Sequence, residues 1–167
     1  MRDLGWWLTN FERSAFRLET LAVYQVPQEA EWFALWQRSG KLPELTPDND
    51  SWLGLVAQAK ARQRQVQRVH LVTPPLTDYL RFEFVLQRSS VECGEDCRVA
   101  DRTDHPELAD LNADFWLFDD QKAVVLDYDH EGKFVQASER DDPERYCQLR
   151  DLVMDCSISL KEYLAKL

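Results

Sequence analysis

The stretch DFWLFDDQKAVVLDYDHEGKFVQA, residues 114–137, decides the fold of this chain. Two runs of β-forming residues stand on either side of short polar turns, as in a β-hairpin. Side chains alternate along a strand, so each run should present an apolar side to both faces of a sheet. We expect Phe115, Leu117, Val124 and Leu126 on one face and Trp116, Phe118 and Val125 on the other. Burial on both faces predicts that this hairpin forms the middle of a sheet.

The acidic residues of the same stretch fall at its turns. DYDHEG, residues 127–132, begins like the calcium-binding loop DxDxDG, but Ser138 stands where such a loop needs a bidentate Glu at its twelfth position. Gly132 instead suits a tight hairpin turn. We therefore predict a turn there and no metal site.

Length and composition indicate one soluble α/β domain spanning residues 1–167. The chain has 167 residues, 30 acidic against 20 basic side chains and a formal charge of −10. A charge of that sign disfavours direct binding to nucleic acid. The opening residues MRDLGWWLTNFERS lack a long apolar run, so we expect neither a signal peptide nor a membrane segment, and a cytoplasmic location.

Four cysteines, Cys93, Cys97, Cys147 and Cys156, are expected to be free thiols in that compartment. The CxxxC spacing of the first two fits a structural zinc site poorly. The three histidines, His70, His105 and His130, are not spaced as paired ligands on one helix. We expect no metal and no cofactor.

Helical spacing and capping residues predict helices flanking the sheet. A helix over residues 29–38 ends before Gly40, a second begins at Ser51, a third follows Thr77 or Asp78, and a fourth opens at Pro143. Residues 67–73 and 97–101 are predicted strands, the former beside the central hairpin. The first 26 residues fit either a helix or extended chain. A mixed sheet flanked by helices is thus predicted.

A group of cations ends the second predicted helix and continues past it: Lys60, Arg62, Arg64 and Arg68. Cations near a helix C-terminus complement the macrodipole and solvate an exposed face. The alternative is a phosphate-binding patch. The acidic composition favours the first interpretation.

Polar side chains embedded in apolar stretches are the candidate ligand-binding residues. They are Arg17, Glu19, His70, Tyr79, Arg81, Glu83, Trp116 and Asp119. Burial of unpaired charge is costly, so such residues either form a buried ion-pair network or line a pocket. Both alternatives stay open. No GxSxG, GxxxxGK[ST] or GxGxxG motif is present, and we identify no catalytic residue.

Three motifs, FRLETL at 16–21, PLTDYLRFE at 75–83 and DFWLFDD at 114–120, resemble a family of small actinobacterial proteins of unknown function. Members of that family are commonly encoded beside helix-turn-helix regulators, which implies a role in regulation or conflict and a protein partner of that kind. The order of elements is also similar to half of a phospholipase D-like domain. The HxK motif of that fold would fall at residues 114–116, where the chain has Asp, Phe and Trp.

From these observations we expect a noncatalytic binding or regulatory module. One alternative is an enzyme acting on a phosphorylated or nucleotide substrate through Arg17, His70, Arg81 and an acid such as Glu83 or Asp119. A second alternative is a toxin or immunity component.

Overall fold

The computed structural model describes residues 2–167 as a single α/β domain built on a mixed sheet. The strands are β1 (Ser14–Glu19), β2 (Gln65–Val72), β3 (Asp96–Asp101), β4 (Asp114–Phe118), β5 (Lys122–Tyr128), β6 (Phe134–Arg140) and β7 (Ile158–Ser159). They form a seven-stranded sheet in the order β6-β5-β4-β1-β2-β3-β7. The pairs β1–β2 and β2–β3 are parallel, and every other pair is antiparallel.

The centre of this sheet is β1 and not the predicted hairpin. β1 lies between β2 and β4, so β2 does not contact β4 as its neighbour. The hairpin's outer strand, β6, is an edge strand. β1, SAFRLE, is short and contains two charged residues. For that reason the sequence alone does not predict that it is the central strand of the sheet.

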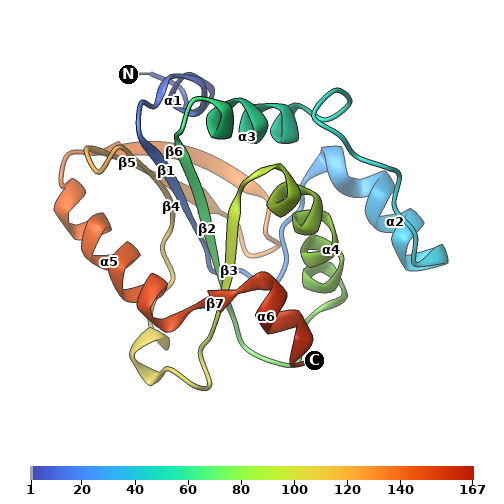
Figure 1. The fold of residues 1–167 in the computed structure, drawn as a ribbon. Helices are drawn as coiled ribbons and strands as arrows, with labels where there is room; N and C mark the ends of the chain where they lie inside the picture. Colours follow the sequence, from blue (N-terminus) through green and yellow to red (C-terminus); the bar gives the residue numbers. More distant parts are fainter. Residues whose placement is uncertain (1) are drawn as a thin grey trace.

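Helices cover both faces of the sheet (Figure 1). They are α1 (Leu4–Asn10), α2 (Ala30–Ser39), α3 (Ser51–Ala61), α4 (Asp78–Cys93), α5 (Pro143–Cys156) and α6 (Leu160–Ala165), with 3-10 turns η1 (Pro27–Glu29) and η2 (Pro106–Leu108). α5 lies against one face, whereas α3, α4 and α6 lie on the opposite side. No helix among residues 2–167 has the length and apolar character needed to cross a bilayer.

Local capping chemistry sets the helix ends largely as the sequence predicted. The Asp50 side chain accepts from the N–H of Leu53 at the start of α3, and Thr77 accepts from the N–H of Leu80 at the start of α4. Gly40 ends α2 in the left-handed conformation, with φ of 68°. At the ambiguous N-terminus the chain forms both elements, first α1 and then β1.

The face under α5 is an apolar core. Its members include Phe16, Leu18, Val69, Leu71, Phe115, Leu117, Ala123, Tyr146 and Val153. The predicted facing of β5 was wrong by one residue: Val124 pairs with Trp116, and together with Leu126 it faces the opposite side from Phe115. Phe118 pairs with Lys122, so three residues connect β4 to β5. An odd loop length reverses the facing that a two-residue turn would give.

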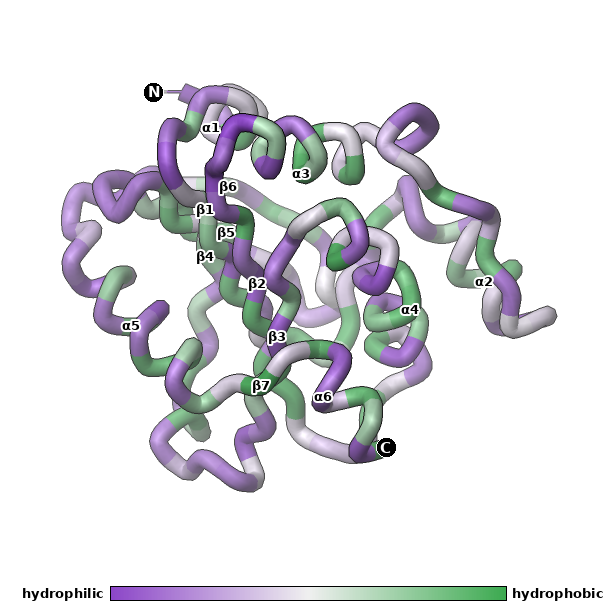
Figure 2. The backbone as a smooth tube through the Cα atoms, in the orientation of Figure 1, coloured by the Kyte–Doolittle hydropathy of each residue, from purple (hydrophilic) through white to green (hydrophobic). Residues whose placement is uncertain are grey.

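The opposite face combines two apolar clusters with a row of polar residues between them. One cluster packs under α1 and α3 and contains Phe118, and the other packs under α4 and contains Phe82. We define the polar belt as Arg17, Glu19, Arg68, His70 and Asp114, all of which come from the strands at the centre of the sheet. In Figure 2 hydrophilic stretches interrupt the hydrophobic strands in this region. A charged row inside a sheet must be paired or serve a site.

Gly132 in the β5–β6 turn is expected to tolerate no side chain. Its φ is 83°, and a Cβ there would lie 2.3 Å from the carbonyl oxygen of Val23. We expect Gly132→Ala to lower the free energy of unfolding by more than the roughly 1–2 kcal/mol that a left-handed residue costs by itself. Chemical denaturation measures the change. Gly40→Ala is the matched control, since φ is 68° with nothing within 4 Å of the added Cβ. Equal losses for the two variants would contradict the close packing of this turn.

Candidate functional site

Asp114 accepts four hydrogen bonds at one end of the polar belt. Its Oδ2 accepts from Arg17 Nη2 at 3.1 Å and from the Tyr24 hydroxyl, while Oδ1 accepts from the N–H and the hydroxyl of Thr20. Arg17 Nη2 also donates to the hydroxyl of Tyr128 at 3.1 Å. The Arg17 and Asp114 side chains are 5% and 3% exposed. This half of the belt is a closed network that joins β1 to β4 and the segment after β1.

Arg68 holds the other half together. Its Nη1 donates to Glu19 Oε1 at 2.6 Å, and its Nε donates to Glu95 Oε1 at 2.8 Å. The second oxygen of Glu95 accepts from the Ser90 hydroxyl at 2.6 Å and from the indole N–H of Trp52 at 3.2 Å. The Arg68 guanidinium also lies over the Trp52 ring, 5.4 Å from its centroid. One cation therefore balances two buried carboxylates.

Charges within the belt act strongly on one another because water is excluded. Burial alone would raise the pKa of Glu19, but the guanidinium groups of Arg68 and Arg17 outweigh it and bring that pKa to about 2. Burial likewise disfavours charged Arg68, yet Glu95 and Glu19 raise its pKa well above the usual value. Both ion pairs of Arg68 thus persist at neutral pH.

His70 lies beside Glu19 in the register of β1 and β2 and is 1% exposed. Its Nε2 donates to the Leu21 carbonyl at 2.8 Å. Burial lowers the pKa of this imidazole, so the ring stays neutral at physiological pH. Enclosed between Phe84 and Tyr24, His70 is held as a structural side chain and not as a base open to substrate.

A cavity of about 180 Å³ opens where the belt meets α3 and α4. Its polar wall is made of Glu29, Trp52, Arg68, Glu83, Gln87 and Glu95. Hollows of about 510 Å³ lie elsewhere, between α1 and α3 and beside η1. The smaller cavity differs from them because unpartnered buried polar atoms line it.

Glu83 and Gln87 supply these unpartnered atoms. They are four residues apart on α4 and so share one face of the helix. Within residues 2–167 neither Glu83 Oε1 nor Gln87 Nε2 has a hydrogen-bond partner, although both atoms are buried. Gln87 is only 7% exposed. A buried donor and a buried carboxyl oxygen without partners are costly to the fold unless a water molecule or a ligand satisfies them.

The Glu83 carboxyl has no counter-charge of its own. Burial raises its pKa well above the ordinary value, and a hydrogen bond to the Glu29 carboxyl, together with the charge of that carboxyl, raises it further. Glu29 is held in place by the Tyr79 hydroxyl, which donates to its Oε2 at 3.1 Å. Arg68 lowers the pKa of Glu83 but does not compensate for these effects. The cavity therefore carries an excess of carboxyl groups.

The predicted site residues divide into those that gather at the belt and those that do not. Arg17, Glu19, His70, Tyr79, Glu83 and Trp116 lie in or beside it. The Arg81 side chain is 54% exposed and pairs with Asp78 on its own helix, so it lies outside the buried ion-pair network. Asp119 lies in the β4–β5 turn, where its carboxylate accepts from the N–H groups of Glu12, Arg13 and Ser14. Asp119 therefore ties the segment before β1 to the β4–β5 turn.

Sequence reasoning missed two residues of the belt, Arg68 and Asp114, and their neighbour Glu95, which lies just before β3. Arg68 was assigned to the cations at the end of a helix, but it lies in β2 and is buried in ion pairs. Glu95 and Asp114 stand at the starts of strands, where a charge is ordinarily solvated. Alternation along QVQRVHLV would have placed Arg68 and His70 on one face, and that signal was available.

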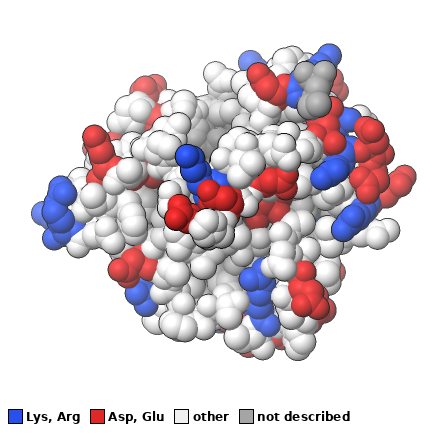
Figure 3. Space-filling view, turned by 180° about the vertical axis from the view of Figure 1, so that it is seen from behind, with Lys and Arg blue, Asp and Glu red and all other residues white. Residues whose placement is uncertain are grey.

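Surface charge offers no basic patch on the face drawn in Figure 3, where Lys and Arg are scattered among Asp and Glu. The predicted cation group is dispersed: Arg64 lies over the ring of Phe11, and Arg68 is internal.

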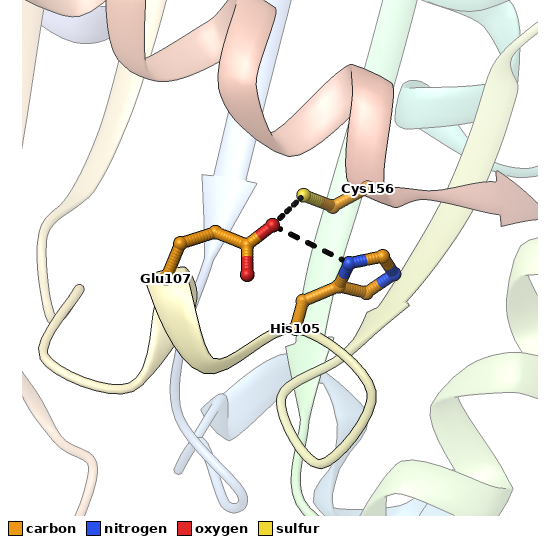
Figure 4. Close-up of side chains that lie close together, drawn as sticks. All are labelled: His105, Glu107 and Cys156. Atoms are coloured by element: carbon orange, nitrogen blue, oxygen red, sulfur yellow. Dashed lines mark hydrogen bonds and ion pairs between the residues drawn. The ribbon is translucent and has the colours of Figure 1, made fainter.

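A second cluster, formed by His105, Glu107 and Cys156, lies where the connector between β3 and β4 meets the end of α5 (Figure 4). The carboxylate stands between the other two side chains: its Oε1 is 3.5 Å from His105 Nδ1 and accepts from Cys156 Sγ at 3.4 Å. Burial and this carboxylate raise the pKa of the Cys156 thiol to about 11. A nucleophilic cysteine needs a base beside its sulfur and a lowered thiol pKa. Here the carboxylate separates the imidazole from the sulfur, and the thiol pKa is raised.

Comparison with known proteins identifies a family without assigning an activity. No curated protein matches the chain. A family model described as a domain of unknown function, DUF6879, matches residues 2–165. The match covers the whole sheet, the polar belt and the cavity beside it. The chain therefore belongs to the DUF6879 family.

Proposed function

We propose that this domain is a noncatalytic binding module, and that its ligand site is the cavity between Arg68 on β2 and the Glu83–Gln87 face of α4. The observation that carries the proposal is the pair of buried, unpartnered polar atoms on that wall. A ligand that satisfied both would remove a cost that the folded protein otherwise bears.

The chemistry of the wall favours a small ligand carrying an ammonium or guanidinium group. A cation beside Glu83 and Glu29 would supply the missing counter-charge, and a neighbouring acceptor on the ligand would take the free N–H of Gln87. The ring of Trp52 adds an aromatic surface, to which organic cations are attracted. A volume of about 180 Å³ suits a small molecule or the end of one side chain.

The pairing of the charged residues in the belt favours noncatalytic binding over an enzyme that acts on a phosphorylated or nucleotide substrate. Phosphate recognition needs free guanidinium groups, whereas Arg17 and Arg68 are each committed to buried carboxylates. Nucleophilic catalysis at phosphorus would need an accessible histidine, whereas His70 is enclosed and neutral. The phospholipase D-like topology expected from the order of elements would then be a scaffold without its HxK chemistry.

A regulatory role with a helix-turn-helix partner is the finer part of the proposal. It rests on the family resemblance carried by the FRLETL, PLTDYLRFE and DFWLFDD motifs. Co-purification of the two proteins encoded together, with and without a small cation present, tests it. A complex whose stability responds to the cation supports regulation, and two proteins that never associate would refute this part alone.

Glu83→Gln is expected to stabilise the protein at neutral pH. A carboxyl with a raised folded-state pKa gives stability that is complete below the unfolded pKa of about 4.5 and is lost as pH rises toward the folded value. Glutamine mimics the protonated form and removes that loss. We expect a gain of the roughly 0.5–2 kcal/mol typical of single stabilising changes, absent at pH 4. Thermal unfolding across pH 4–8 measures it.

The control for this stability change is Glu92→Gln, the same substitution at an exposed position of α4. It is expected to leave the unfolding profile unchanged. A Glu83→Gln variant less stable than the wild type at neutral pH would show that the carboxylate is already compensated.

Binding is tested by calorimetric titration of the whole chain with propylammonium and methylguanidinium chloride, with propanol as the uncharged probe. We expect the two cations to bind and to release protons, because the cation favours ionised Glu83. Glu83→Gln should abolish the proton release and weaken binding at least about tenfold, the loss of one charge-assisted hydrogen bond. Glu92→Gln should bind as the wild type does.

Equal affinity for propanol and propylammonium would overturn the cationic ligand class. Absence of binding for all three probes, or binding that Glu83→Gln leaves intact, would overturn the assignment of the cavity as the ligand site.

A further inference from the structure

The cluster of His105, Glu107 and Cys156 brings together an imidazole, a carboxylate and a thiol. His105 and Glu107 come from the connector between β3 and β4, and Cys156 is the last residue of α5. One donor atom from each residue lies within 4.8 Å of the other two. Cysteine, histidine and glutamate are the side chains that bind zinc in proteins. Cys156 lies 49 positions beyond Glu107 in the chain, so only the fold brings it beside the other two.

Two of the three separations match those of a tetrahedral zinc site. Bonds of about 2.3 Å to sulfur and about 2.0 Å to nitrogen and oxygen place neighbouring ligand atoms about 3.3–3.6 Å apart. In the cluster, Glu107 Oε1 is 3.5 Å from His105 Nδ1 and 3.4 Å from Cys156 Sγ. The third pair, His105 Nδ1 and Cys156 Sγ, lies within 4.8 Å, so binding of one ion would draw these two side chains together.

The backbone that carries these ligands is held by packing independent of any ion. Leu108 is fully buried in the core under α5, and its N–H donates to the His105 carbonyl at 3.0 Å. Arg98 donates from Nε and Nη2 to the hydroxyl and carbonyl oxygens of Ser157, the residue after Cys156. A fixed scaffold presents the ligands without an ordering cost at binding.

We propose that His105, Glu107 and Cys156 bind one Zn²⁺ ion, with the fourth position open to the neighbouring groove. That groove has a volume of about 490 Å³, and His105 and Cys156 form part of its wall together with Arg81 and Tyr163. A carboxylate and a thiolate neutralise the charge of the ion, and the thiol proton leaves to solvent on binding. Magnesium and calcium prefer oxygen ligands, so the donor set selects zinc against them.

The site differs from the ligand cavity of the proposed function and stands without it. Glu107 and Cys156 line no part of the cavity beside Glu83. Zinc binding here would tie the connector between β3 and β4 to the end of α5 and place a Lewis-acidic ion in the groove with Arg81. The predicted absence of a metal site rested on the spacing of cysteines and histidines along the chain, and such spacing cannot show that His105 and Cys156 meet in the fold.

Titration of metal-free protein with Zn²⁺ against a chromophoric chelator tests the proposal. We expect one ion per chain, and affinity lowered by Cys156→Ser, His105→Ala and Glu107→Gln by at least the roughly 10–100-fold that loss of a supporting residue costs at metal sites. Co²⁺ should show a thiolate charge-transfer band that Cys156→Ser removes. The matched controls are Cys93→Ser, a half-buried thiol at the end of α4, and His130→Ala, an exposed histidine.

A second measurement uses the wild-type chain, so a variant that fails to fold cannot obscure the result. Zn²⁺ should slow alkylation of Cys156 by iodoacetamide at least tenfold while leaving Cys147, also half-buried, at its metal-free rate. Unchanged alkylation of Cys156, or zinc binding that is lost in Cys93→Ser or His130→Ala and retained in Cys156→Ser, would overturn the proposal. Glu83→Gln is expected to bind zinc normally, which separates this result from the test of the cavity.

Discussion

Replacement of Asp114 by alanine is expected to lower the free energy of unfolding by about 3–5 kcal/mol, the cost of breaking a buried ion pair from one side. Asp114 accepts from Arg17, Thr20 and Tyr24, and its side chain is 3% exposed. The variant leaves the Arg17 guanidinium buried without its counter-charge. It also frees the segment after β1, which Asp114 ties to β4.

Urea denaturation of Asp114→Ala measures this loss, and Asp141→Ala is the matched control. Asp141 forms an ion pair with Lys122 at 3.5 Å, but its side chain is fully exposed at 101%. Exposed pairs contribute about 0–1 kcal/mol, so this variant should unfold nearly as the wild type does. Similar losses for the two aspartates would contradict the central structural role of Asp114.

Arg68→Met is expected to cost a similar 3–5 kcal/mol at neutral pH, because it leaves two carboxylates, Glu19 and Glu95, without their cation. The pH dependence should also reverse. In the wild type the pKa of Glu19 is lowered to about 2, so its contribution is complete above the unfolded value of 4.5 and is lost as pH falls through 2. Without Arg68, Arg17 is the one guanidinium left to oppose the effect of burial, so we expect the pKa of Glu19 to rise. The variant should therefore recover stability as pH falls from 7 toward 4.5.

Thermal unfolding at several pH values tests this reversal. Arg145→Met is the control, because Arg145 lies on α5 over the ring of Tyr146 and has no ion pair among the described residues. The triple variant Glu19→Gln, Arg68→Met, Glu95→Gln should regain much of the loss, since no uncompensated charge remains. A deficit that is independent of pH, or one that the triple variant does not reduce, would contradict the electrostatic account.

Local signals in the sequence were enough to predict most of the helices and strands. Gly40, Asp50, Thr77 and Pro143 mark helix ends that the structure confirms, because capping depends on side chains within three or four residues of the end. Strand order did not follow from local signals. β1 reads as a short and charged strand, and its place at the centre depends on pairing with β2 and β4 far along the chain.

The candidate site could be predicted only in part for the same reason. Polar residues inside apolar stretches identified Arg17, Glu19 and Glu83, but their partners lie at long separations: Asp114 is 97 residues from Arg17. Arg81 and Asp119 share the same sequence signal, yet Arg81 is solvated and Asp119 binds the backbone of the segment before β1. Composition shows that a charge needs a partner, and only the fold determines which one.

The most direct test of the central claim is the pKa of the Glu83 carboxyl, measured by carbon-detected NMR with and without propylammonium. The account predicts a pKa above the ordinary value in the free protein, because the carboxyl is buried and lies beside Glu29, and a fall in that pKa when the cation binds. An ordinary pKa in the free protein, or a raised value that saturating propylammonium leaves unchanged, would contradict the claim that this carboxyl is held ready for a cationic ligand.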